Sequence, residues 1–527
     1  MKIHSVCRSA IAMAIGVAST AVSAANIGPS TAAEPYMKAN PLLGDRVAVI
    51  SVLTVGDTIG GYTMAGIPDG LGGINNGDGT FDLILNHEFG PEAGTVRAHG
   101  STGSFLSRWK IRNTNLEVLS GRDAVASGTD VNTWDTDSQW FVSGTDAFNR
   151  FCSATLASPQ AFIFENGETY GTADRIFLTG EETRPPFSDD HGRGFAYVAT
   201  GPEAGKLYEL PTLGKMAFEN IAPHPHSRMR TLVIGLDDAD RVTDPASTDA
   251  PSELYVYAGW KQTTGNVVAR AGLLNGILRG VRVYQAGDAI PEESNEFGLG
   301  NAEMGFVRRA QFTLVDHGWV ANKTGAELQA ESIAGDVTRF QRIEDGAWDP
   351  RPGHENDFYF VTTGNFRGAG DASNLASRLW QLRFRDVDDP FRYGGTIELL
   401  LDGDEGHQML DNLTVDIYGR IVMQEDVGGN ARLGKIWLYG IETQELIEVA
   451  AHDPRYFSEG AAEFITTDEE SSGITDMHDV LGAGWYMFDV QAHEDHPDAA
   501  LVEYGQLLAI YIDPLLGTNF DFDWWDL

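Results

Sequence analysis

The segment from Phe81 to Glu88 reads FDLILNHE, an apolar run that ends in polar residues and a carboxylate. The same design recurs as RIFLTGEE at 175–182, TLVIGLDD at 231–238 and RIVMQED at 420–426. Short apolar runs that are rich in β-branched and aromatic residues and bounded by turn residues are typical of strands. One strand that ends in Asp or Glu carries little weight, because strands commonly do so at turns. Four of similar design indicate equivalent strands whose acidic ends meet in one place.

Many other segments have the same strand character, among them Glu253–Tyr257, Asp357–Val361 and Lys435–Tyr439, and strongly periodic helical segments are few. Short strands without helices between them favour a sandwich, a barrel or a propeller, and a chain of 527 residues favours the propeller. We therefore expect an all-β fold: a single large β-propeller, six-bladed, with loop insertions. The sequence repeats themselves are too weak to count the blades.

The first 24 residues predict a secretory signal peptide. A short basic start with Lys2 and Arg8 precedes an apolar run to about Val22, and the segment ends in Ala-Val-Ser-Ala. The run is too short for a membrane span, and the lack of an Arg-Arg pair indicates general secretory export. We expect a signal peptide at 1–24, a propeller domain at 25–527 and a periplasmic or extracellular location.

The formal net charge is −39 at pH 7. Such a surface disfavours nucleic acid and anionic membranes, and we expect neither as a partner. It suits divalent cations, or a salty medium that screens self-repulsion. We expect the chain to act as a monomer. The chain has no HExxH, CxxC, EF-hand, P-loop or GxSxG motif.

Cys152 and Cys7 are the two cysteines of the chain, and Cys7 lies in the expected signal peptide. A free exposed thiol is a liability in an oxidising compartment. The thiol is therefore either buried in apolar packing, where it is inert, or held by a metal as a thiolate. The residues around Cys152 leave both alternatives open.

Taken in order, several segments resemble the PhoX-type alkaline phosphatases, a family of secreted β-propellers. The resemblance spans roughly Asp82 to His493. The matching segments are LILNHEFG around Glu88, FNRFCSATLA around Cys152, RIFLTGEE ending at Glu182, LGKMAFEN around Glu219, FQRIEDGAWDP around Arg342 and Glu344, and MLDNLTVDIYGRIVMQED from Asp411 to Asp426.

The resemblance implies calcium and iron ions at one end of the propeller axis. It implies that Cys152 is the iron thiolate, with Glu182, Glu219 and Glu344 as its glutamate partners. It also implies that Arg342 engages the phosphate, and that Arg342 and Glu344 are the catalytic residues. The further carboxylates that it places near the metals are Glu88, Asp411, Glu425 and Asp426. The expected function is a metal-dependent phosphatase acting on small phosphate esters, where cations neutralise phosphate oxygens and activate water.

Two alternatives stay open, because the segment from Ser153 to Gly180 differs from the family pattern. One is a calcium-stabilised propeller with a binding or surface role and no catalysis. The other is a different propeller hydrolase, of the lactonase or phytase kind, since a fold does not determine a function.

Overall fold

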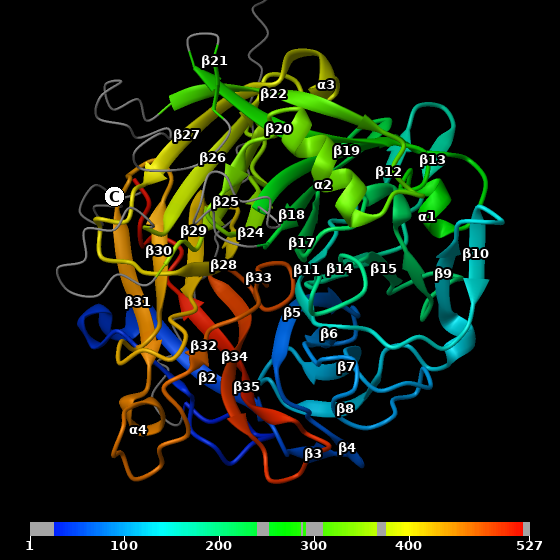
Figure 1. Cartoon of the computed structure of the whole chain (residues 1–527). Coiled ribbons are helices and arrows are strands. Elements are labelled where there is room, and N and C mark those ends of the chain that lie inside the picture. The colour runs from blue at the N-terminus through cyan, green and yellow to red at the C-terminus, as the bar shows by residue number, and fades with distance from the viewer. Residues whose placement is uncertain (1–25, 240–251, 286–287, 291–308, 366–375, 520–527) are drawn as a thin grey trace, which may run out of the picture.

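The computed structural model describes residues 26–239, 252–285, 288–290, 309–365 and 376–519. The expected signal peptide lies outside the described residues. Within them the chain forms a six-bladed β-propeller, seen in Figure 1 along its axis, which confirms the predicted all-β fold. The longest helix, α2 (Gly325–Ala334), contacts β22 (Arg309–Gly318) and begins with a capping box between Thr324 and Glu327.

Each blade is an antiparallel sheet whose innermost strand lies at the axis. Blade 1 is β5 (Pro68–Asn75), β6 (Thr80–His87), β7 (Phe105–Arg112) and β8 (Val118–Asp123). Blade 2 is β11 (Phe151–Leu156), β14 (Ile176–Glu181), β15 (Gly194–Val198) and β16 (Leu207–Glu209), extended by β9 (Val131–Asp135) and β10 (Trp140–Ser143). Blade 3 is β17 (Phe218–Pro223), β18 (Arg230–Asp237), β19 (Ser252–Trp260) and β20 (Ile277–Gln285).

The second half of the chain continues this pattern. Blade 4 is β24 (Ile343–Trp348), β25 (Asp357–Thr362), β26 (Arg378–Phe384) and β27 (Gly395–Leu401). Blade 5 is β28 (Leu410–Val415), β29 (Arg420–Glu425), β30 (Lys435–Gly440) and β31 (Leu446–His452), with β1 (Met37–Ala39) at its edge. Blade 6 is β32 (Glu469–Glu470) and β33 (Ile474–Asp476) inside, then β34 (Trp485–Asp495), β35 (Glu503–Ile512) and β2 (Val47–Thr54).

Two features close and brace the ring. β2 pairs with β35, so the last blade combines strands from both ends of the described chain. β22 (Arg309–Gly318) pairs with both β20 and β27 and joins blades 3 and 4 at their outer edges. Pairing these edges removes exposed strand edges, which would otherwise invite association with other chains.

The remaining elements are short loop insertions. They are the strands β3 (Thr58–Ile59), β4 (Tyr62–Thr63), β12 (Ile163–Glu165), β13 (Thr169–Gly171), β21 (Asp288–Ile290) and β23 (Arg339–Phe340), the helices α1 (Val267–Arg270), α3 (Pro390–Tyr393) and α4 (Pro454–Phe457), and 3₁₀ turns at Pro41–Arg46, Gly128–Asp130 and Pro211–Leu213. Among the described residues, no helix has the length and apolarity needed to cross a membrane.

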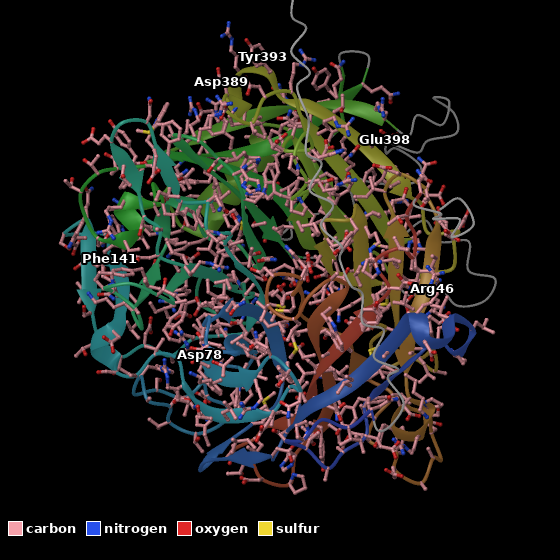
Figure 2. The ribbon with its side chains drawn as sticks, turned by 180° about the vertical axis from the view of Figure 1, so that it is seen from behind. Arg46, Asp78, Phe141, Asp389, Tyr393 and Glu398 are labelled. Atoms are coloured by element: carbon pink, nitrogen blue, oxygen red, sulfur yellow. The ribbon has the colours of Figure 1, made fainter. Side chains whose placement is uncertain are left out.

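The core consists of apolar layers between neighbouring blades, because alternate residues of each strand face the two adjoining sheets. Between blades 1 and 2, for example, Ile84, Phe151 and Phe195 are fully buried in one cluster. Viewed from behind, Asp389 and Glu398 lie near the outer edge of the molecule (Figure 2). The inner strands β5, β11, β17, β24, β28 and β33 surround the axis in Figure 1, and this arrangement positions the site.

Candidate metal centre

One polar ring lines the axis of the propeller. The second residue of the innermost strand carries a metal-ligating side chain in every blade of the described chain. In blade order these six axial donors are Asp69, Cys152, Glu219, Glu344, Asp411 and Glu470.

A β-bulge accompanies the axial donor in blades 1 to 5. In blade 2, for instance, the pairing advances three residues from Phe151 to Ala154 but only two on β14, and blades 1, 3, 4 and 5 have the same shift at the same point. A bulge adds one residue to a strand and re-aims its side chains. The repeated bulge therefore explains how five innermost strands deliver a polar side chain to the axis at the same level.

A second set of side chains directly follows the second strand in blades 1 to 5 and lies within β34 in blade 6. Its members are Glu88, Glu182, Asp238, Thr363, Asp426 and His493, which we call the tail residues. The backbone N–H of each tail residue donates to a carbonyl two residues before the axial donor of its own blade, at 2.8–3.0 Å. The acidic strand ends recognised in the sequence are thus equivalent positions of one structural repeat.

The axial donors and tail residues form a chain of overlapping ligand groups. Within each group, one ligand atom per residue lies within 4.8 Å of the others. The four groups are Asp69–Glu88–Cys152, Cys152–Glu182–Glu219, Glu219–Glu344–Asp411 and Asp411–Asp426–Glu470. Consecutive groups share a residue, so the donors form a connected arc around the axis. Every expected ligand except Glu425 belongs to this arc.

Glu425 lies beside Asp426 but points away from the arc. Its carboxylate accepts hydrogen bonds from Arg432 at 2.7 and 3.1 Å, from Trp437 Nε1 at 2.9 Å, and from the backbone N–H groups of Gln408 and Lys435. Neighbouring residues of a strand face opposite sides. The last residue of each acidic tail therefore faces the axis, and the one before it faces the space between blades.

The same alternation holds in two other blades. Glu181, next to Glu182, forms a two-pronged ion pair with Arg193, and Asp237, next to Asp238, accepts from the backbone N–H of Ala217.

Two arginines flank the arc. Arg342 binds Asp238 through Nε at 3.1 Å and Nη2 at 2.6 Å, and its Nη2 lies 2.8 Å from Glu344. Arg150 places Nη2 at 2.7 Å from Glu88 and 2.5 Å from Glu182. Both have a left-handed backbone, with φ of 62° at Arg342 and 51° at Arg150. Ile67 and Met409, at the equivalent positions of blades 1 and 5, also have positive φ, so this conformation belongs to the repeated bulge.

Burial disfavours the ionised carboxylates of the arc, which outnumber their cationic neighbours. Nine carboxylates, including Asp238, gather within the described residues around Arg150, Arg342 and His493. Burial raises the pKa of Glu88 to about 7 and that of Asp426 to about 7. It also raises the pKa values of Glu219, Glu344 and Asp411 well above their ordinary value. Buried charges need a counter-charge, and cations bound at the arc would supply it.

Cys152 is buried in the arc, and its Sγ donates to Asp69 at 3.4 Å. Burial and the neighbouring Asp69 and Glu219 raise the pKa of this thiol well above its usual value. A thiolate at this position therefore requires a bound cation beside it. The thiol is buried, but its neighbours are ligand oxygens and it belongs to none of the apolar core clusters of the described chain, so the structure favours the metal-ligand alternative over inert apolar packing.

On the far side of the arc, His493 lies 2.7 Å from Glu503 through Nδ1 and 3.5 Å from Glu470 through Nε2. Burial acts to lower the pKa of His493, but its hydrogen bonds to both carboxylates raise it to about 11. Gln491 donates Nε2 to Asp69 and Glu88 at 3.1 and 3.0 Å. These contacts orient the ligand oxygens of blades 1 and 6.

Sequence reasoning did not find Asp69, Glu470 and Arg150. One signal was available for Arg150: the pattern Arg-x-donor occurs at both Arg150-Phe151-Cys152 and Arg342-Ile343-Glu344. Asp69 and Glu470 begin short or bulged strands and follow no apolar run, so no local pattern distinguishes them.

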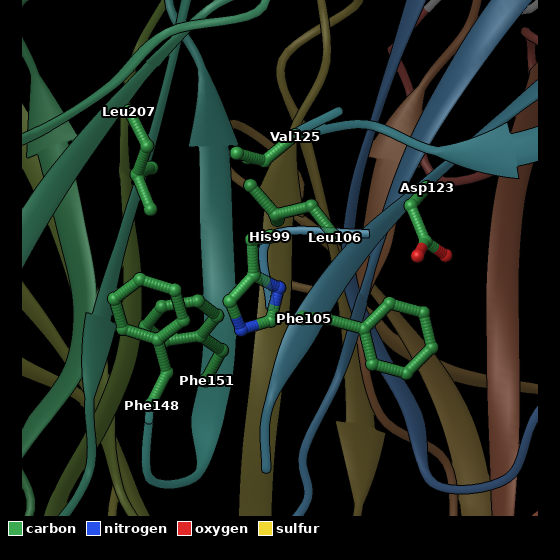
Figure 3. Close-up of a pocket in the computed structure, with 8 residues that line it drawn as sticks. All are labelled: His99, Phe105, Leu106, Asp123, Val125, Phe148, Phe151 and Leu207. Carbon is green, nitrogen blue, oxygen red and sulfur yellow. The ribbon is translucent and has the colours of Figure 1, made fainter. Parts of the chain in front are cut away.

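Other candidate sites are less suited to a ligand. Asp349, His354 and Asp357 lie together, but Arg351 and Arg383 already pair with the two carboxylates. Figure 3 shows a small cavity behind Phe151, lined also by His99 and Phe148. Its volume of about 10 Å³ suffices for about one water molecule, not for a substrate.

No protein-family model and no curated protein sequence matches the chain. Among solved structures, the chain is similar to Pseudomonas fluorescens PhoX in complex with vanadate, a transition-state analogue. The TM-score is 0.60 at 13% sequence identity, over 90% of this chain and 96% of that one. A protein of unknown function from Dyadobacter fermentans gives a TM-score of 0.39 at 10% identity, over 88% and 99% of the two chains. The similarity to PhoX supports a PhoX-like fold, whereas the second is too weak to carry an argument.

Proposed function

We propose that this chain is a metal-dependent phosphatase that hydrolyses small phosphate esters at the axial ring. One observation carries the proposal: every blade contributes its second inner residue to a connected arc of metal ligands, and two arginines stand beside that arc. Cations that neutralise phosphate oxygens and planar cationic donors that bind them are together well suited to phosphate-ester hydrolysis.

The donor set fits two kinds of cation. Cys152 with Glu182 and Glu219 offers a sulfur and carboxylate oxygens, which suits iron. Asp411 with Asp426 and Glu470 offers oxygen ligands alone, which suits calcium. When bound, such cations neutralise phosphate oxygens and lower the pKa of a bound water.

The chain's own residues supply orientation and charge. The planar fork of Arg342 matches two phosphate oxygens. Asp238 holds that fork at two of its nitrogens, which leaves Nη1 without an acceptor in the described part of the chain. Hydrolysis forms a bond between a water oxygen and phosphorus, breaks the bond from phosphorus to the ester oxygen, and leaves the alcohol with a proton from water.

The fold gives independent support. A solved structure with a TM-score of 0.60 over 90% of this chain is that of a PhoX in complex with vanadate, a transition-state analogue. In line with this similarity of fold, we propose a small-molecule substrate. In line with the signal peptide expected at 1–24, we place the protein in the periplasm or outside the cell, as a monomer.

Phosphate release from an aryl phosphate, measured with added Ca²⁺ and iron, tests the proposal. We expect activity in the wild type, loss of at least a hundredfold in Glu344→Gln, and no change in the control Glu117→Gln. Glu117 is an exposed carboxylate that pairs with Arg112 and lies between β7 and β8, the two outer strands of blade 1.

Elemental analysis of the same samples identifies the metals. Stoichiometric calcium without phosphate release from any ester would favour the non-catalytic, calcium-stabilised propeller instead. Full activity in Glu344→Gln would refute the axial site.

A further inference from the structure

Arg150 occupies in blade 2 the position that Arg342 occupies in blade 4. Each lies two residues before the axial donor, and its carbonyl accepts from the tail residue of its own blade, Glu182 or Thr363, at 2.9 Å. The other four blades carry Ile67, Ala217, Met409 and Asp468 at this position. Within the described chain, two of the six equivalent positions are therefore cationic, and they flank blade 3.

Both arginines reach back to the preceding blade. Arg150 contacts Glu88 of blade 1, and Arg342 contacts Asp238 of blade 3. Blade 3 lies between blades 2 and 4 and has only the methyl group of Ala217 at the equivalent position. Glu182 acts electrostatically on both arginines, so the two guanidinium groups lie near the same carboxylate.

Some of the N–H donors of Arg150 have no acceptor among the described residues. Its contacts to Glu88 and Glu182 both use Nη2, and in the described structure Nε and Nη1 have no acceptor. Its side chain is 48% exposed, twice the 24% of Arg342. A guanidinium that only neutralised buried carboxylates would gain from turning more of its N–H groups toward them. Instead Arg150 presents a free edge to solvent beside the arc.

We propose that Arg150 forms a second oxyanion subsite, so that the preferred substrates are phosphate esters with a second anionic group. The reacting phosphoryl group lies at Arg342 and the cations, and the second phosphate or carboxylate of the same molecule binds Arg150. This inference rests on the proposed function. It makes Arg150 a specificity-determining residue, which distinguishes it from a fixed counter-charge for Glu88 and Glu182.

Three related esters test the subsite: phenyl phosphate, 4-carboxyphenyl phosphate and benzene-1,4-diyl bisphosphate. We expect Arg150→Gln to lower kcat/KM for the two esters that carry a second anionic group at least tenfold more than for phenyl phosphate, because it removes a charge-assisted hydrogen bond. Dividing variant by wild type for each ester cancels leaving-group differences. Arg150→Lys keeps the charge but not the planar fork, so its effect should fall between those of the wild type and Arg150→Gln. It replaces Arg150→Gln as the test if that variant folds poorly.

The matched control is Arg112→Gln, since Arg112 is 45% exposed and pairs with Glu117 at the rim. We expect it to match the wild type on all three esters. An equal proportional loss on all three esters in both Arg150 variants would refute the subsite, because a mere counter-charge acts on every substrate alike.

A binding measurement separates this inference from the proposed function. Calorimetry on the metal-loaded protein compares phenylphosphonate with 4-carboxyphenylphosphonate, neither of which can be hydrolysed as an ester. The subsite requires tighter binding of the carboxylated compound in the wild type and loss of that difference in Arg150→Gln. If no ester is hydrolysed but this difference is found, the proposed function fails and the subsite stands. If the two compounds bind equally to the wild type, the subsite is refuted.

Discussion

Glu425 and Asp426 are neighbours in the sequence, yet their neutral variants should change the stability of the metal-free protein in opposite directions. Asp426 lies in the arc of ligands, where burial and the charge of Glu470 raise its pKa from 3.8 to about 7. Since its folded-state pKa exceeds its unfolded value, ionisation costs the folded state free energy as pH rises from about 4 to about 7. Above pH 7 the full cost applies, about 4 kcal/mol at 1.4 kcal/mol per pKa unit.

Asp426→Asn removes that cost and retains the hydrogen bond that Oδ1 accepts from the N–H of Gly428. Because neighbouring carboxylates share the cost, we expect a net stabilisation of about 1–3 kcal/mol at pH 8 in a chelator. Burial also raises the pKa of Glu425, but Glu425→Gln places an amide NH₂ against the donors of Arg432 and Trp437, from which the carboxylate accepts in the wild type. Leaving buried donors unsatisfied costs about 2–4 kcal/mol.

Guanidinium denaturation at pH 8 in chelator, and again with Ca²⁺, measures both effects. With Ca²⁺, Asp426→Asn should instead be less stable than the wild type, because it lacks one ligand and gains less stability from the metal. Glu425→Gln should gain as much from Ca²⁺ as the wild type. Similar destabilisation of the metal-free protein by both variants, or loss of calcium binding in Glu425→Gln alone, would refute the assignment of the two side chains to opposite faces.

Three further outcomes are expected. In chelator, the wild type should lose at least about 3 kcal/mol of stability between pH 4.5 and 7, since folding raises the pKa of Glu88 from 4.5 to about 7 and that of Asp426 from 3.8 to about 7. A denaturation series in which stability instead rises over this range would contradict the metal-free electrostatics. Cys152→Ser should lower bound iron at least tenfold while calcium content stays the same, and elemental analysis showing unchanged iron would exclude the thiolate. Arg342→Lys should lower kcat/KM about ten- to a hundredfold through loss of the planar fork, with a thermal midpoint close to that of the wild type, and unchanged steady-state kinetics would exclude Arg342 from the phosphate site.

Local sequence patterns are sufficient to predict the strands and part of the candidate site. An apolar run followed by an acidic tail is enough to identify Glu88, Glu182 and Asp426 as related positions. The same pattern also predicts that Glu425 faces away from the axis. Side chains alternate along a strand, so if the last residue of the tail faces the axis, the one before it does not.

The sequence by itself determined that the chain is a propeller with carboxylates at the ends of its second strands, since strand propensity and alternation depend only on neighbouring residues. Only the tertiary structure decided that Asp69 and Glu470 complete the ring and that Arg150 and Arg342 occupy equivalent positions. Those residues lie at bulges and short strands, whose direction is determined by pairing with other strands and by the closure of blade 6 through β2 and β35. Pairing between segments hundreds of residues apart leaves no periodic signal in the sequence, so the six donors become one site only when the ring closes.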